Sequence, residues 1–91
     1  MATVHDLIKT RNKHYGDFET EAMLIQELNT AVLYHAESVS EVELSPLHRE
    51  AIHMILHKIG RIANGNPNHA DSWQDIAGYA QMVVDYIEKD R

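Results

Sequence analysis

Residues 45–88 read SPLHREAIHMILHKIGRIANGNPNHADSWQDIAGYAQMVVDYIE, and this stretch decides the fold. Ser45-Pro46 favours a helix start, because a serine side chain accepts from free N–H groups and proline suits the first helical position. Asn64-Gly65 is a typical stop, since glycine readily takes the left-handed conformation that ends helices. Between them, apolar residues at steps of three and four indicate one buried helical face: Leu47, Ala51, Met54, Ile55, Ile59 and Ile62.

The connector, residues 66–70, is too short to reach far, so we expect the next helix to fold back antiparallel. That helix is expected to start near Asp71. Gly60 and Gly78 lie inside the two helices, where glycine is unfavourable unless it allows close approach. The second helix carries its own apolar series: Trp73, Ile76, Ala77, Ala80, Val83, Val84 and Ile87. The stretch therefore predicts a closely packed helical hairpin.

The N-terminal part predicts a short helix that begins at Thr3, with Asp6 completing a weak capping box. A corner at residues 15–17 should end it, with Gly16 at positive φ and Asp17 capping the next helix. We expect this corner to place Arg11 or Tyr15 near the helical hairpin.

A longer helix should follow the corner, from about Phe18 to Ala36. Its apolar face is broad enough to pack on two partners: Phe18, Ala22, Met23, Leu24, Ile25, Leu28, Val32 and Leu33. Residues 37–44 are acidic and contain serine, which is typical of a surface loop. No alternating strand pattern and no tandem repeat is present.

We therefore predict an all-α fold in a single domain, residues 1–91, with a short N-terminal helix and three longer helices packed as an antiparallel bundle. A chain this small buries a modest fraction of its surface, so we expect it to form a homo-oligomer. The net charge of −6 argues against broad nucleic-acid or anionic-membrane binding. No cysteine, membrane-length apolar run or signal-peptide core is present, which favours a cytoplasmic protein.

Carboxylates and histidines are the candidate metal ligands. Asp71 and Asp75 lie one turn apart on one face and could bind a divalent cation, since hard ions prefer carboxylates. Alternatively, Asp71 caps its helix and Asp75 pairs with Lys58 or Arg61. His53 and His57 have the i, i+4 spacing of metal ligands, but a hydrogen-bonded or exposed pair fits that spacing better.

Two cations and two aromatic rings are candidates for binding a nucleotide. Lys58 and Arg61 could hold phosphate oxygens, although ion pairing with Asp75 and Asp71 fits equally well. Trp73 could stack on a base, but a single tryptophan on an apolar face usually belongs to the core. The expected corner would bring Tyr15 to the same place. No serine lies in a nucleophile-elbow context, so nucleophilic catalysis is not expected.

Two segments carry a resemblance that covers most of the chain: RNKHYGDF at residues 11–18 and HKIGRIANGNPNHADSWQDIAGYA at residues 57–80. They resemble a group of small uncharacterised phage and prophage proteins. More loosely, the layout is similar to nucleotide-modification-associated and MazG-like all-α nucleoside triphosphate pyrophosphatases. That resemblance implies a helical, oligomeric, Mg²⁺-dependent protein that cuts between the α- and β-phosphates.

The chain departs from the metal-binding pattern of those pyrophosphatases. Ser72 stands where the pattern has a glutamate, and no Glu-Glu-x-x-Glu segment exists. Under the resemblance, Asp75 and Asp71 would hold Mg²⁺, with Glu50 as the nearest substitute on the facing helix. Since cleavage of a phosphoanhydride by Mg²⁺ needs several carboxylates, this loss affects catalysis more than nucleotide binding.

The leading expectation is a phage or prophage accessory protein that handles a nucleotide or another phosphorylated small molecule. Its most specific form would be Mg²⁺-dependent pyrophosphohydrolysis. The alternative is a non-enzymatic phage protein that sequesters a nucleotide signal, or that binds a host protein through an oligomeric helical surface. Turnover of nucleoside triphosphates with Mg²⁺ separates the two.

Overall fold

The structure is a computed structural model that describes residues 3–89, and its regular elements are all helical. A short π-helical turn, η1, extends the second helix. This confirms the all-α class and the order of one short and three longer helices. The elements are α1 (Val4–Tyr15), α2 (Phe18–Tyr34), η1 (His35–Val39), α3 (Pro46–Asn64) and α4 (Ala70–Lys89).

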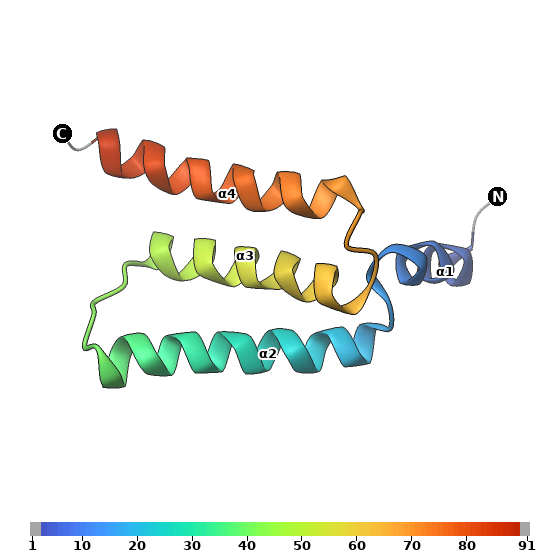
Figure 1. Cartoon of the computed structure of the whole chain (residues 1–91), viewed down its shortest axis with the longest axis horizontal. Coiled ribbons are helices and arrows are strands. Elements are labelled where there is room, and N and C mark those ends of the chain that lie inside the picture. Colours follow the sequence, from blue (N-terminus) through green and yellow to red (C-terminus); the bar gives the residue numbers. More distant parts are fainter. Residues whose placement is uncertain (1–2, 90–91) are drawn as a thin grey trace.

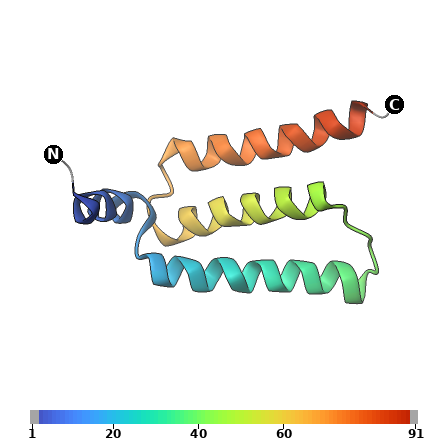
Figure 2. The same ribbon diagram turned by 180° about the vertical axis from the view of Figure 1, so that it is seen from behind.

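The three longer helices lie antiparallel and side by side in a single layer, with α3 in the middle (Figures 1 and 2). α3 packs against both α2 and α4, whereas α2 and α4 do not contact each other within residues 3–89. α1 contacts α2 and α3 and projects from one end of the layer. The molecule is accordingly flat and long, with extents of 50 × 29 × 22 Å.

The helix starts follow the expected capping chemistry. Thr3 and Asp6 form a capping box at α1. Asp17 caps α2 and accepts from the backbone N–H and hydroxyl of Thr20, and these bonds lower the pKa of Asp17. Ser45 caps α3 and is followed by Pro46 at the first helical position. α4 begins at Ala70, so the following aspartate lies in its first turn and is not the cap.

The corner between α1 and α2 is bound to the C-terminal end of α3. Gly16 has φ +79°, and a Cβ atom there would collide with the backbone oxygen of Asn64. The Asn64 amide donates to the carbonyl oxygens of Tyr15 and Asp17 at 2.9 Å each. The corner therefore places α1 against the helical hairpin, as predicted.

The other three glycines differ in how closely neighbouring atoms approach them. Gly60 meets Ile25 of α2, whose Cγ1 would lie 2.5 Å from an added Cβ, so close approach is confirmed there. Gly78 has nothing within 4 Å, and the same expectation for it was wrong. Gly65 was expected to be left-handed but has φ −139°. It instead leaves room for the backbone of His14 and Tyr15.

The buried interior is small and partly charged. Ile25, 3% exposed, is the one apolar residue among residues 3–89 that is fully buried. Glu21, Lys58 and Ser72 are buried with it. Trp73 was expected to point inward but is 53% exposed. None of the helices described is long and apolar enough to cross a membrane.

Candidate functional site

A buried glutamate lies where α1, α2 and α3 meet. Glu21 is 1% exposed, and its Oε2 accepts from Nη2 of Arg11 at 2.7 Å. Its Oε1 lies 3.6 Å from Nε of Arg61. An unpaired buried carboxylate is costly, so the two guanidinium groups supply the counter-charges that this buried side chain needs.

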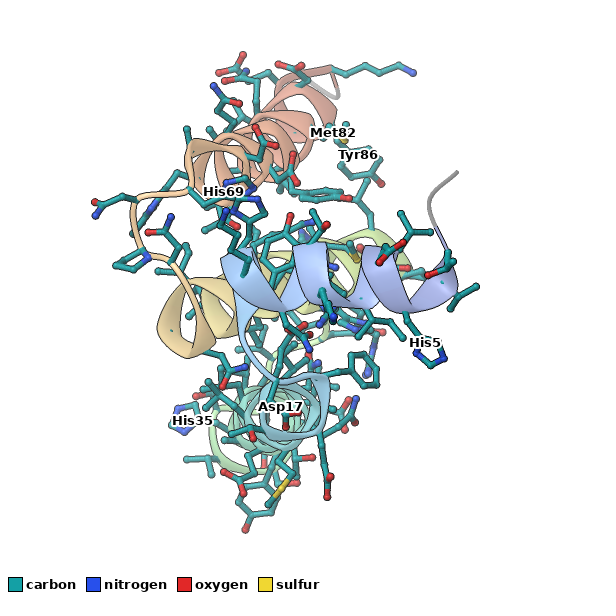
Figure 3. All side chains as sticks on the ribbon, turned by 90° about the vertical axis from the view of Figure 1, so that its right-hand side faces the viewer. His5, Asp17, His35, His69, Met82 and Tyr86 are labelled. Carbon is teal, nitrogen blue, oxygen red and sulfur yellow. The ribbon has the colours of Figure 1, made fainter. Side chains whose placement is uncertain are left out.

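The ring of Tyr15 lies close to both of these arginines. The guanidinium carbon of Arg61 is 4.3 Å from the centre of the Tyr15 ring, and that of Arg11 is 5.6 Å away. The tyrosine hydroxyl is 3.5 Å from Nε2 of His69, whose ring stacks on His14 with the ring centres 4.2 Å apart. Figure 3 shows His69 above the C-terminal end of α1, where the chain leads into α2. Two predicted nucleotide-binding residues, Tyr15 and Arg61, are thus brought together.

Lys58, the other predicted cation, is paired across the hairpin. Nζ of Lys58 lies 3.0 Å from Oδ2 of Asp75, which joins α3 to α4. The lysine side chain is 11% exposed and the aspartate side chain 49%. The ion-pair alternative for these two residues is therefore confirmed.

The predicted metal ligands do not gather. Glu50 is 71% exposed and lies 3.6 Å from His53, on the flank of α3 that faces α2. It precedes Lys58 by eight residues, about 12 Å along the helix. Asp71 is 72% exposed and lies 3.6 Å from His69. Within residues 3–89 no three acidic or histidine side chains are placed to hold a metal ion, so these donors form no ready magnesium site.

Trp73 lies away from the paired cations. Its indole N–H donates to the carbonyl oxygen of Pro67 in the connector, at 2.7 Å. Two residues along a helix correspond to a rotation of roughly 200°, so Trp73 and Asp75 point to opposite flanks of α4. The structure therefore does not bring Trp73 together with Lys58 and Arg61.

The histidine pair on α3 splits into an exposed and a half-buried ring. The ring centres of His53 and His57 are 6.5 Å apart. Burial lowers the pKa of His57, and the nearby Arg61 cation lowers it further. The half-buried His57 ring therefore favours the neutral form, beside the Arg61–Glu21 contact.

Glu21, which organises this site, was not among the residues predicted from the sequence. A signal for it exists. Glu21 lies three residues after Phe18 and four before Ile25, on the inner stripe of α2, where a carboxylate needs a partner. An acid on a buried stripe should prompt a search for an arginine on a neighbouring helix.

Comparison with known families gives one match. A family model described as a domain of unknown function (DUF6378) matches residues 1–86. Searches of curated proteins and of solved structures find no match. The family description states no activity.

Proposed function

The chain belongs to the DUF6378 family, a domain of unknown function, and we propose that it binds a nucleotide or another phosphorylated small molecule. The binding site would be the Arg61 cluster, which comprises Arg11, Tyr15, Glu21, Lys58 and Arg61. The observation that carries the proposal is the position of Arg61 over the Tyr15 ring, with Lys58 one turn away on the same helix.

The charge of the cluster suits an anion. With Asp75 included, three cations stand against two carboxylates, in a chain whose net charge is −6. The side chains of Arg11 and Arg61 are 25% and 22% exposed, so both remain within reach of a ligand. Guanidinium groups match phosphate oxygens through paired N–H donors.

Glu21 would act as the positioning residue of the cluster. Its carboxylate contacts both arginines, and because it is buried it does not itself meet a ligand. A guanidinium group already held by packing loses less entropy when it binds phosphate. Tyr15 supplies an aromatic face on which a base could stack.

The resemblance to phage and prophage proteins supports an accessory role in a phage or prophage. The looser resemblance to MazG-like pyrophosphatases supports pyrophosphohydrolysis as the most specific form of the proposal. Mg²⁺ usually binds through one or two carboxylates together with substrate phosphates. Apart from the buried Glu21, Asp75 is the carboxylate that contacts a cluster cation, so a magnesium ion carried in by a nucleotide would meet Asp75.

A thermal-shift panel of nucleoside mono-, di- and triphosphates, with and without Mg²⁺, tests the proposal. We expect at least one nucleotide to raise the melting temperature of the wild type by several degrees. Arg61→Gln should abolish this shift, whereas Arg49→Gln, which alters an exposed arginine earlier on α3, should preserve it. No shift in the wild type with any nucleotide at millimolar concentration would overturn the proposal.

Chromatographic detection of released pyrophosphate then separates an enzyme from a binding protein. One observation favours the non-enzymatic alternative, a phage protein that binds a host protein. The projecting helix α1 exposes Val4, Leu7 and Ile8 by 70%, 62% and 47%, at the i, i+3, i+4 spacing of a docking helix. A nucleotide-induced shift without turnover would instead support sequestration of a nucleotide signal.

A further inference from the structure

The chain leaves more of its surface uncovered than a compact monomer of its size. Its accessible surface is 6673 Å², whereas a compact protein of 10.4 kDa exposes about 5,400 Å². The excess of about 1,300 Å² exceeds the roughly 800 Å² that each partner covers in a standard interface. The radius of gyration, 15.5 Å, also exceeds the value of about 12 Å for a compact domain of this length.

One broad face of the helical layer leaves apolar side chains of the long helices exposed. We call it the Ile59 face. On it, Ile59, Val84 and Ile87 are 39%, 42% and 46% exposed. Its apolar members come from all three long helices: Leu24, Leu28, Ile52, Ile59, Val84 and Ile87.

The position of these residues follows from helix geometry and two surface hollows. Ile52 of α3 and Ala80 of α4 line the same hollow, so they lie on the same side of the layer. Val84 and Ile87 follow Ala80 by four and seven residues and therefore share its face of α4. Glu50 precedes Ile52 by two residues, which corresponds to a rotation of roughly 200° around α3. Glu50 therefore lies on the other side of the layer, where it lines a hollow between α2 and α3. Figure 3 agrees, with His35 on one side of the layer and Met82 and Tyr86 on the other.

The two faces differ sharply in charge. The six residues named for the Ile59 face are all apolar, whereas Glu50 and Arg49 line the hollow on the opposite side of the layer. Glu50 lies on the opposite side of the layer, and Arg61, eleven residues or about three turns later on α3, points to that same side. Two copies of a chain with net charge −6 repel each other, so only a face without charges can be buried against itself at low cost.

We propose that a second copy of this chain covers the Ile59 face. A two-fold axis would bring two three-helix layers together face to face, because such an interface pairs one patch with itself. The Arg61 cluster then remains on the outer side of each layer, open to a ligand. Formation of this dimer does not depend on nucleotide binding, and the experiments below use no nucleotide.

A pair of charge substitutions on one helix tests the face. Val84→Glu and Met82→Glu add the same charge two residues apart, at side chains that are 42% and 63% exposed. By light scattering after gel filtration, the wild type and Met82→Glu should have twice the 10.4 kDa mass of one chain. Val84→Glu should shift the population to the single-chain mass. A monomeric wild type at tens of micromolar would overturn the proposal.

Thiol protection gives a readout that does not require the dimer to be broken. The chain has no cysteine, so Ile59→Cys and Met82→Cys each introduce a single thiol. In the native dimer, a bulky maleimide should modify Ile59→Cys at least tenfold more slowly than Met82→Cys, and dilution or Val84→Glu should remove the difference. Equal rates in the undiluted protein, or faster modification of Ile59→Cys, would show that another molecule or solvent occupies this face.

Discussion

Nζ of Lys58 lies 3.0 Å from Oδ2 of Asp75, and this ion pair joins the middle helix of the layer to α4. The lysine belongs to the few buried residues of residues 3–89, whereas half of the aspartate side chain reaches solvent. A buried ammonium group is costly without a counter-charge. The pair therefore holds a cation at the edge of the Arg61 cluster and links two helices.

Asp75→Asn should lower the free energy of unfolding by about 1–3 kcal/mol, because it leaves the Lys58 ammonium group without its anion. Urea unfolding followed by circular dichroism measures the loss. Asp71→Asn is the matched control, one turn earlier on α4 and largely exposed, and it should change the stability little. Nucleotide binding that disappears in folded Asp75→Asn would show that Asp75 also meets the ligand or its metal.

Gly16→Ala should destabilise the protein by about 1–3 kcal/mol, because the left-handed backbone and the adjacent Asn64 oxygen both oppose a Cβ atom. The melting temperature should fall. Asn64→Ala should also lower it, since its amide holds the carbonyl groups on both sides of the corner. An unchanged melting temperature in Gly16→Ala would mean that the corner does not hold α1 in place.

The two helix glycines should respond in opposite directions. Gly60→Ala adds a methyl group against Ile25 and should cost about 1–3 kcal/mol. Gly78→Ala meets no atom within 4 Å and should stabilise α4 by about 0.5–1 kcal/mol. Thermal unfolding of both variants provides the comparison. A loss of stability in Gly78→Ala would reveal a contact that the isolated chain lacks.

His57 should make the protein sensitive to mild acid. Its pKa in the folded chain is lowered by burial and by Arg61, so below the unfolded-state pKa of about 6.5 the unfolded chain takes up more protons. The contribution of His57 to stability is therefore full at pH 7.5 and falls as the pH drops through 6.5 toward the folded pKa.

Urea unfolding at pH 7.5 and pH 5.5 checks this sign. The stability lost between these two pH values should be smaller in His57→Gln than in the wild type. His53→Gln, one turn away with a side chain that is 47% exposed, should keep the wild-type dependence. An equal pH dependence in the wild type and His57→Gln would contradict the assignment.

The helices could be predicted from sequence because their signals are local. Caps at Thr3, Asp17 and Ser45 and apolar steps of three and four are read within one or two turns. The stop at Gly65 was read correctly as a boundary but for the wrong reason. Its small size serves α1, which arrives from 50 residues earlier in the chain. Local sequence patterns do not predict contacts between segments that lie far apart in the chain.

The site was predictable only in part. The stripe of Lys58 and Arg61 and the corner at Tyr15 were visible in the sequence, and the structure brings Arg61 and Tyr15 together. Glu21 was missed because charge alone suggested a solvent-exposed residue. The proposed approach of Glu50 to the two aspartates depended on which flank of α3 faces α4. Periodicity identifies faces of a helix but does not name their partners.

The bond between the backbone N–H of Asn66 and the carbonyl oxygen of His14, 2.7 Å long, has a consequence for the order of folding. α1 is held by Glu21 of α2, by Asn64 at the end of α3 and by this bond from the connector. A ribosome that synthesises α1 first must therefore release some 50 further residues before the docking surface of α1 is complete. The two helical hairpins, α2–α3 and α3–α4, are formed by sequence neighbours and need no such delay. The first helix to be made can therefore dock only after α2 and α3 have been made.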